Sequence, residues 1–453
     1  MNVPLNGVPK VSAILVTYNQ SRFLARAVRS LLGQSYRDFE LIVVDDCSPD
    51  GSGDLAEQLT RGTQARVVRH LTNSGQYRTY NQSLSLARGE YVLFSSGDDV
   101  NSPELLAREV EVLECHPRVA MVFSNVLLVD ERNRVLCDLS GLQSASMPWL
   151  RHNYVHSGVE ELPRLLNENY VVCIGCALIR KSALLEVGGW DETLPQAADW
   201  DLWLRFAARY DIAYVAEPLL AWRQHADTVT SRLRRSGGYY QDNIRVLEKA
   251  FAALPETCRH LSTSRPQLLA RAFVAAAAAD IAARRTEEGR ARLATAVELD
   301  AGILVDGEQL VELLCRHGAS LIDPEEPSRA VLDYVDRVLA ALPSQPSWLG
   351  GWRNWCYARA LWTVAVQARG QGHMAAVRRH ASRAAWLAPR FVARRDAISL
   401  APAFVPFGGR LAAAYRRLRP RQPVGPLAGA LLGQESGSRG PDGREAREAH
   451  VDV

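Results

Sequence analysis

Two pairs of adjacent carboxylates, each at the end of a strongly apolar run, are the residues of this sequence best suited to chemistry. Asp98 and Asp99 close a run that begins at Tyr91, and Asp45 and Asp46 close an earlier one. Carboxylate oxygens bind hard divalent cations, which in turn bind phosphate groups. Because the carboxyl ends of parallel strands meet at one edge of a sheet, the two pairs should lie close together. The sequence therefore predicts a site for a metal ion and a phosphorylated ligand.

The segments that must position these acids alternate between short β-rich runs and amphipathic helices. Strands are expected at 11–17, 39–44, 65–70 and 91–96, and helices from Ser21 to Gly33, at 54–60, at 79–87 and from Ser102 onward. Such alternation predicts an α/β fold with a doubly wound, mostly parallel sheet. Ligands of these folds bind beyond the carboxyl ends of the strands, where both acidic pairs fall.

Length and composition bound the organisation of the chain. A chain of 453 residues exceeds the size at which one hydrophobic core usually splits, and strand signals fade beyond about residue 240. We therefore expect an α/β domain over residues 1–235, an all-α domain over 236–432 and a disordered tail over 433–453. The net charge of +3 is small for this length and predicts no nucleic-acid partner.

Cysteine use and hydropathy indicate a cytoplasmic protein. The eight cysteines are scattered, and residues 1–10 lack the apolar core of a signal peptide, so reduced thiols are expected. Cys173 and Cys176 have the spacing of a redox or metal motif, but they lie in an apolar run without a second pair, which favours core packing. No apolar run reaches the roughly 18 residues that a membrane span requires.

The helical region contains a weak internal repeat. Arg271–Ala301 aligns without gaps on Arg359–Pro389, and each unit is predicted to form two helices around a turn, at 288–289 and 371–372 respectively. The pattern resembles tetratricopeptide units, which are about 34 residues long. Because only two units are visible, helical hairpins packed on the α/β domain and a true solenoid both remain open.

Short motifs follow one another in a fixed order between residues 11 and 231. They are Val16-Thr-Tyr-Asn19, Val43-Val-Asp-Asp-Cys-Ser48, Asn73-Ser-Gly75, Asn81, Ala87-Arg-Gly-Glu-Tyr91, Gly97-Asp-Asp99, Gly188-Gly-Trp-Asp-Glu192 and Ala198-Asp-Trp-Asp-Leu-Trp-Leu-Arg205. In order and spacing this part of the chain resembles the family 2 glycosyltransferases, which have the GT-A fold. The resemblance implies inverting transfer of a sugar from a nucleoside diphosphate sugar to a hydroxyl acceptor, usually with Mn²⁺ or Mg²⁺.

The resemblance assigns donor-binding roles to the strand ends. Asp98 is the expected metal ligand and donor contact, with Asp99 in support, and a capped turn is the structural alternative. Asp46 is expected to contact the nucleobase, whereas Asp45 either orients the turn or touches the ribose; an Asx turn fits Asp46 as well. The other donor-binding candidates are Thr17, Tyr18, Asn19 and Arg78.

The chain departs from the family pattern at two positions. Ser96 stands in the first place of the family motif Asp-x-Asp-Asp, which leaves metal dependence open. Tyr80 stands where members often carry Arg before the residue matching Asn81, so the diphosphate contact passes to Arg78 or is absent. A solvated arginine at a helix start is the alternative for Arg78.

The same resemblance makes Asp199 the general base that takes the acceptor proton, a task suited to a carboxylate that is ionised at neutral pH. A helix cap is the alternative role. Gly189, Trp190 and Asp191 match the loop that shapes the sugar and acceptor pocket. Trp190 could stack on a sugar ring or equally fill the core.

Two further segments complete the expected site. Arg223 and His225 match a closing segment that folds over the diphosphate, although a lone histidine on a loop is often just exposed. Asp201 lies two residues after the expected base and is predicted to cap the helix or to pair with Arg205.

Partners beyond the donor follow from the family and from one basic stretch. A glycan or lipid-linked acceptor is implied by the resemblance. Gly409–Arg421 is basic and amphipathic, so weak peripheral contact with the inner face of a membrane is one reading and a soluble basic helix the other. The helical region could bind a protein partner.

Two functions are weighed. The first is an inverting, metal-assisted glycosyltransferase of surface glycan or polysaccharide biosynthesis. The second is a catalytically impaired sugar-nucleotide binding or scaffold protein that works through its helical region. The retained Asp98, Asp99 and Asp199 favour the first. A dehydrogenase is disfavoured because no GxGxxG motif follows the first strand.

Overall fold

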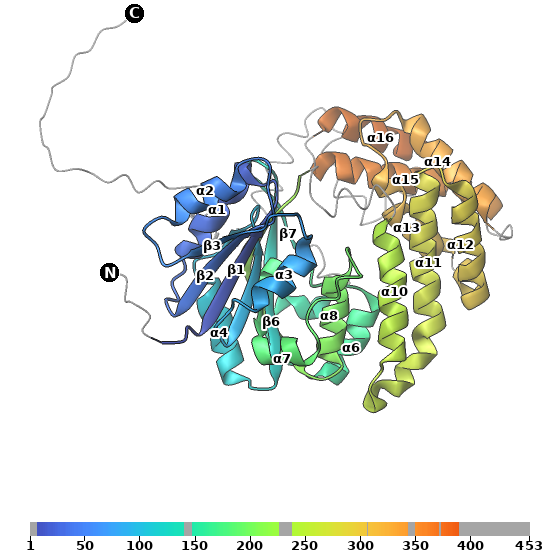
Figure 1. Ribbon diagram of the computed structural model, residues 1–453. Coiled ribbons are helices and arrows are strands. Elements are labelled where there is room, and N and C mark those ends of the chain that lie inside the picture. The colour runs from blue at the N-terminus through green and yellow to red at the C-terminus, as the bar shows by residue number, and fades with distance from the viewer. Residues whose placement is uncertain are drawn as a thin grey trace, which may run out of the picture.

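The computed structural model describes residues 7–139, 147–225, 238–305, 307–342, 349–370 and 373–388. Its N-terminal half is a sheet with helices on both faces, and its C-terminal half is helical (Figure 1). The strands are β1 (Val11–Thr17), β2 (Phe39–Asp45), β3 (Arg66–Arg69), β4 (Tyr91–Ser96), β5 (Val100–Asn101), β6 (Val119–Val129), β7 (Val135–Asp138), β8 (Tyr154–His156), β9 (Ala177–Arg180) and β10 (Asp211–Arg223).

The helices divide between the two halves. Those of the first half are α1 (Ser21–Leu32), α2 (Ser52–Thr60), α3 (Gln76–Leu84), α4 (Leu105–Cys115), α6 (Gly158–Asn167), α7 (Lys181–Glu186) and α8 (Ala198–Ala207). Those of the second half are α10 (Gly238–Ala252), α11 (Arg265–Ala282), α12 (Thr286–Leu299), α13 (Gly307–His317), α14 (Ser328–Ala341), α15 (Leu349–Gly370) and α16 (Met374–Leu387).

The described strands form one sheet in the order β3-β2-β1-β4-β9-β6-β10-β5, with β7 paired to β6 and β8 to β10. The pairings from β3 to β4 are parallel. Beyond β4 the sheet becomes mixed, because β9 runs antiparallel between β4 and β6. The fold is therefore α/β, and its sheet is parallel in the part where the acidic pairs lie.

Alternating side chains of the parallel strands enter two different cores. Ala13 and Leu15 of β1 pack with the apolar faces of α1 and α4 on one side of the sheet. Ile14 and Val16 point to the opposite side and join the core that contains α3, α6 and α8. Helices on both faces follow from this alternation, because each face of a buried strand needs apolar cover.

The predicted elements of the first half match the structure closely, although helix starts shift; the helix expected from Ser102 onward begins at Leu105. The expected strand Val11–Thr17 and the helix that starts at Ser21 and ends before Gly33 occur as predicted. The helix expected at 79–87 begins three residues earlier, at Gln76. Its start follows Gly75, whose φ of +83° suits a residue without a side chain.

The helical half is built from hairpins. α11 packs on α12 and α15 packs on α16, as the internal repeat predicted. The turn of the first hairpin was misplaced, because 288–289 lies inside α12 and the chain turns at 283–285. Gly289 instead sits where α12 meets α11, and a Cβ there would lie 2.4 Å from Ile281 Cγ1. The likeness to tetratricopeptide units stays a prediction.

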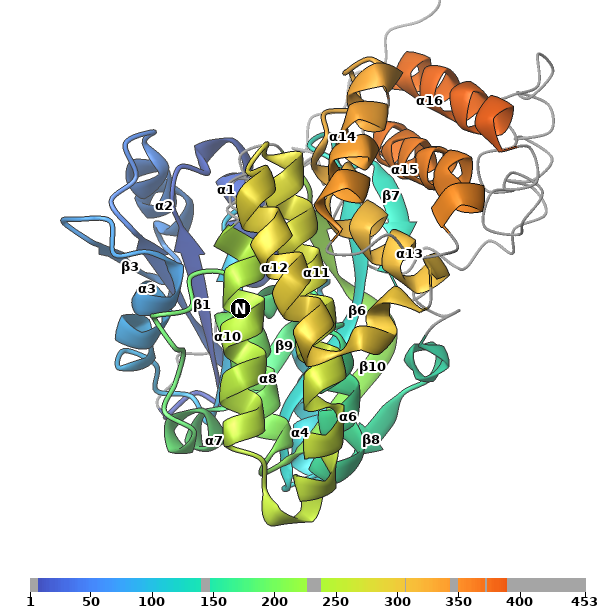
Figure 2. The ribbon, with the colours of Figure 1, turned by 90° about the vertical axis from the view of Figure 1, so that its right-hand side faces the viewer.

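The two halves share one apolar core. Tyr240 and Leu247 of α10, with Ala275 of α11, belong to the same buried cluster as Phe94 of the sheet and Trp203 of α8. Figure 1 and Figure 2 show α10 standing beside α8, which separates it from the sheet. A second core lies wholly within the helical half.

No helix in the described ranges is long and apolar enough to cross a membrane. The basic stretch Gly409–Arg421 and the tail 433–453 fall outside those ranges.

Candidate active site

Register in the parallel part of the sheet brings the expected donor-site residues to one edge. Thr17 at the end of β1 pairs with Asp45 at the end of β2. On the other side of β1, Val16 pairs with Ser96 at the end of β4, and Asp98 follows two residues later. The strand ends that the sequence predicted to meet therefore do meet.

Asp98 lies in a turn where its carboxylate accepts two hydrogen bonds. The Ser96 hydroxyl donates to one oxygen. The other oxygen lies 3.0 Å from Nε2 of His225, and both side chains are almost completely buried. Ser96, which stands in the place of the family's first acid, thus orients the second. The structure brings His225 to the acidic turn.

Asp99 is bound to the end of β10. One of its oxygens accepts a hydrogen bond of 3.0 Å from the Arg223 backbone N–H. Burial and the charge of Asp98 raise the pKa of Asp99 well above its usual range, while the hydrogen bond and charge of Arg223 oppose the rise. Asp99 is therefore mainly a support of the turn.

Arg223 is buried beside the acidic turn. It is 1% exposed, and its guanidinium donates to the backbone carbonyls of Asp98 at 2.7 Å and Asp130 at 3.0 Å. The guanidinium also lies over the ring of Phe23, 4.8 Å from its centroid. Arg223 therefore braces the acidic turn from inside the protein, and its expected contact with a diphosphate stays a prediction.

The acidic turn fits a divalent cation in part. Asp98 Oδ2 and His225 Nε2 face each other at hydrogen-bond distance; carboxylate oxygen suits Mn²⁺ and Mg²⁺, and imidazole is a common metal ligand in general. No third histidine, cysteine or acid completes a metal cluster among the residues described. Mg²⁺ and similar ions often take only one or two carboxylates and complete their shell with substrate phosphates and water. These two residues suit a cation that binds together with a diphosphate.

Asp46 is tied to the segment that leads into α3. Its Oδ1 lies 2.8 Å from His70 Nδ1 and accepts the Ser74 N–H at 2.9 Å, and its Oδ2 accepts the Gly75 N–H at 2.9 Å. The side chain is 2% exposed. Asp46 thus orders the wall of the expected base pocket, and any contact with a nucleobase would share these oxygens.

Asp45 orients the turn after β2. Its carboxylate lies 3.3 Å from the Ser48 N–H, and Arg69 Nε is 3.9 Å away. The turn that follows is held by a left-handed Cys47, with φ of +64°. Of the two roles left open for Asp45, the structure shows the turn contact.

The end of β1 offers both a surface and an unused hydroxyl. Tyr18 is 38% exposed, as a residue that covers a base requires. Asn19 adopts a left-handed φ of +60°, and its N–H donates to Ser48 Oγ at 3.0 Å. Thr17 is fully buried, and its Oγ1 has no hydrogen-bond partner in the described structure. Gly97 packs over it, since a Cβ there would lie 2.7 Å from that oxygen.

The two residues at issue in α3 point in different directions. Arg78 is exposed on the helix surface, which matches the solvated alternative. Tyr80 is 1% exposed and packs against Phe94 and Trp190. Burial raises the pKa of its hydroxyl, to which Gln76 donates at 3.1 Å. Tyr80 therefore fills core space where many members carry a cation.

The loop between α7 and α8 turns sharply at its glycines. Gly188 and Gly189 have φ of +90° and +72°, and a Cβ on Gly189 would lie 2.8 Å from Asn81 Oδ1. That side chain also receives the Trp190 N–H at 3.0 Å and donates to the Trp190 carbonyl at 2.9 Å. The Trp190 ring is 2% exposed and lies among Tyr77, Phe94 and Trp203. Of its two expected roles, the structure supports the core role.

Asp191 carries an ion pair rather than an open carboxylate. Its Oδ2 lies 2.7 Å from Lys249 Nζ, and its Oδ1 accepts the Thr193 N–H and hydroxyl. Partial burial works against ionisation, yet these bonds lower the pKa of Asp191 to about 2. Asp201, which is 3% exposed, pairs with Arg205 at 2.7 Å, as predicted, and also with Lys249 at 2.8 Å.

Asp199 lies in the first turn of α8 and is partly exposed. Burial of the carboxyl raises its pKa to about 7, although it accepts hydrogen bonds from the Trp200 N–H at 2.6 Å and from the side chain of Asn169. No cation is among the causes of the shift. A carboxylate with this pKa is well matched to proton abstraction near neutral pH.

Three residues of this region were missed from the sequence. His70 could have been found, because β3 neighbours β2 and its end should reach the same sheet edge. Asn169 and Lys249 carry no local signal, since each is distant in sequence from the aspartate that it binds. Only the tertiary fold brings them there.

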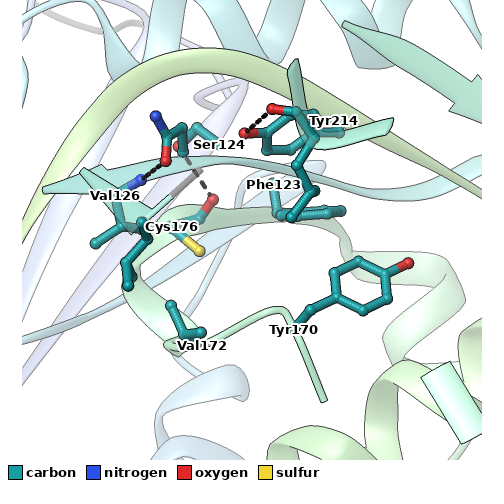
Figure 3. A pocket seen from close by; sticks show the side chains of 10 residues that line it. Phe123, Ser124, Val126, Tyr170, Val172, Cys176 and Tyr214 are labelled. Atoms are coloured by element: carbon teal, nitrogen blue, oxygen red, sulfur yellow. Dashed lines mark hydrogen bonds between the residues drawn. The ribbon is translucent and has the colours of Figure 1, made fainter. Parts of the chain in front are cut away.

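A small hollow beside β6 is not a substrate site. Figure 3 shows Phe123, Tyr170 and Tyr214 around it, with Cys176 in its wall. Its volume of about 10 Å³ is close to the minimum for one water molecule. Cys173 and Cys176 are both buried and free, as the core-packing interpretation predicted.

A comparison with protein families matches residues 12–188 to the model described as "Glycosyl transferase family 2". Among curated proteins, the "Putative glycosyltransferase EpsE" of Bacillus subtilis is 31% identical over 251 residues, which cover 54% of this chain and 83% of that protein. An "Uncharacterized glycosyltransferase MJ1057" of Methanocaldococcus jannaschii is 24% identical over 239 residues, 51% of this chain and 77% of the relative.

Among solved structures, Staphylococcus aureus TarS 1-349 in complex with UDP-GlcNAc aligns with a TM-score of 0.47 and 17% identity, covering 80% of this chain and 92% of that one. The mannosyltransferase PcManGT from Pyrobaculum calidifontis, in complex with GDP-Man and Mn²⁺, aligns with a TM-score of 0.43 and 17% identity, covering 80% and 87%.

Proposed function

This chain belongs to glycosyl transferase family 2, and on that premise we propose that it is an inverting enzyme that moves a sugar from a nucleoside diphosphate sugar to a hydroxyl acceptor. The observation that carries the proposal is the parallel register of β1, β2 and β4, which gathers Thr17, Asp46 and Asp98 at one sheet edge. A nucleotide sugar needs such an edge, with a flat surface for the base and, for the diphosphate, a cation held by carboxylate.

The donor would lie along this edge. The exposed ring of Tyr18 covers the base, and the segment that Asp46 holds in place forms the opposite wall. Asp98 and His225 would hold a divalent cation, which when bound neutralises charge on the diphosphate. The exposed side chain of Arg78 is the candidate for a direct diphosphate contact.

Asp199 would act on the acceptor. Its carboxylate takes the proton of the attacking hydroxyl while the hydroxyl oxygen bonds to the anomeric carbon. The bond from that carbon to the diphosphate breaks on the opposite face, and its electron pair leaves with the diphosphate. One displacement with one carboxylate base inverts the anomeric configuration. An acceptor that belongs to a surface glycan or polysaccharide, free or lipid-linked, is part of the proposal.

The proposed donor site can be tested by thermal unfolding with UDP, dTDP, GDP and CDP, each with and without Mn²⁺ or Mg²⁺. A ligand at 100 times its dissociation constant stabilises the folded state by about 2.7 kcal/mol, which is readily measured. We expect a metal-dependent shift with one base, followed by release of that nucleotide from its sugar donor. No shift with any of them would favour the scaffold function instead.

The pH dependence of turnover tests the base. Because Asp199 must be deprotonated to act and its pKa is about 7, kcat/KM should fall about tenfold per unit below pH 7. The folded pKa lies above the unfolded value, so the folded state holds the proton more tightly. Stability should therefore decrease as pH rises from about 4 to 7. A turnover profile flat down to pH 5 would contradict the assignment.

A further inference from the structure

The first helix of the helical half grips the loop between α7 and α8. Asp242, Arg245 and Lys249 are spaced i, i+3 and i+7 and so share one face of α10. All three bind this loop or the start of α8, from Asp191 to Asp201. We call these three residues the α10 clamp.

Each clamp residue holds a different point. Lys249 Nζ bridges Asp191 and Asp201 at 2.7 and 2.8 Å. Arg245 donates to the Thr193 carbonyl at 2.8 Å. Asp242, 5% exposed, accepts the Gln196 N–H at 3.0 Å. The residues that the clamp binds are therefore spread along the segment that leads from the glycine turn past Asp199.

The other side of the same segment is held by the α/β half. Asn81 of α3 binds both the N–H and the carbonyl of Trp190. Arg205 of α8 donates to the Val187 and Gly189 carbonyls at 2.6 and 2.8 Å. The loop therefore has two anchors, and the α10 clamp supplies the one nearer to Asp199 in sequence.

Lys249 is the most important member of the clamp, because it pairs with two carboxylates. Asp201 is almost fully buried and has two cationic partners, Arg205 and Lys249. Asp191 is partly buried and has Lys249 as its ion-pair partner in the described structure. A buried carboxylate that loses a cation must take up a proton or move toward water. Either change would shift the turn of α8 that carries Asp199.

We propose that the α10 clamp is a positioning element of the active site, so that the helical half sets the geometry of the acceptor side through Lys249. The inference rests on the proposed role of Asp199 as base. It gives the helical half a task inside the catalytic reaction. Lys249 is a positioning residue here, because it acts through Asp191 and Asp201.

The test compares Lys249→Met with a matched control, Arg353→Met. Arg353 pairs with Asp336 at 2.5 Å within the helical half, far along the chain from the loop, so Arg353→Met removes an ion pair that is more exposed than those of Lys249. Amide hydrogen exchange resolves the loop. In Lys249→Met we expect Thr193 and Gln196 to exchange at least about tenfold faster, while Trp190, held by Asn81, keeps its rate. The control should change none of the three.

Turnover provides the second readout. With UDP-GlcNAc and GDP-Man as probes, Lys249→Met should lower kcat for release of the nucleotide by roughly 10- to 100-fold, the cost of a misplacement of about 1 Å. The melting shift given by the nucleotide should stay within about 1 °C of wild type, and Lys249→Arg should recover part of kcat. Faster exchange with unchanged kcat would overturn the proposal, as would unchanged exchange.

The two hypotheses fail differently. If wild-type protein turns over neither donor and binds no nucleotide, the proposed function fails, whereas the exchange rates still report on the clamp. If Lys249→Met does not fold, Arg245→Met replaces it, because that side chain is 51% exposed and its polar contacts in the described ranges are with the loop and its own helix. It should raise exchange at the loop and lower kcat in the same sense, and failure of both changes would refute the clamp.

Discussion

Asp199→Asn is expected to lower transfer by at least about a hundredfold, the usual contribution of a general base, and to leave nucleotide binding intact. Asparagine keeps the size of the side chain and the bond from the Trp200 N–H, but it cannot take a proton. Turnover and the nucleotide-induced melting shift, measured on the same preparation, separate the two effects.

The variant also has a stability signature. Because burial of the ionised carboxyl is unfavourable, removing its charge should raise the free energy of unfolding at pH 8 and have little effect at pH 4. Asp54→Asn is a suitable control, since Asp54 is exposed on α2 and pairs with surface Arg69 in the described structure. Wild-type turnover by Asp199→Asn would remove Asp199 from the mechanism.

Asp98→Ala is expected to abolish the metal-dependent part of nucleotide binding. Loss of a carboxylate ligand that weakens binding a hundredfold would reduce a stabilisation of about 2.7 kcal/mol, at 100 times the dissociation constant, to about 0.4 kcal/mol. The measurement is the melting shift with nucleotide, with and without Mn²⁺.

His225→Ala should reduce the same metal-dependent melting shift by a smaller amount, because His225 Nε2 would bind the same cation beside Asp98 Oδ2. The shift with nucleotide alone serves as the internal control and should be equal in wild type and both variants. A full metal-dependent shift in Asp98→Ala would place the cation elsewhere.

Local sequence patterns were sufficient to predict most of the α/β half. Apolar runs such as Val11–Thr17 can only be buried strands when amphipathic helices alternate with them. If these strands are parallel, the acids at their carboxyl ends must lie at the same edge of the sheet. The helical hairpins followed from the repeat. The turn of the first one did not, because Gly289 marks a close helix contact rather than a break.

For the site, the sequence predicted the types of residue but not the contacts that they make. Asp98 and Asp46 were identified, but nothing local indicated that Asp46 would be bound by His70 and two backbone N–H groups. Arg223 was expected at the diphosphate because its segment resembles the family's closing segment. Its burial depends on two backbone carbonyls and the Phe23 ring, which no one-dimensional pattern brings together.

The shared core has a consequence for dissecting the protein. A fragment cut at residue 235, where composition changes, would expose the apolar surface that Tyr240, Leu247 and Phe251 cover, and would leave Asp191 without Lys249. Such a truncation should be poorly soluble even if every residue named at the strand ends is present. The smallest piece expected to fold extends at least through Ala252, so the border between catalytic and accessory sequence lies inside the helical half.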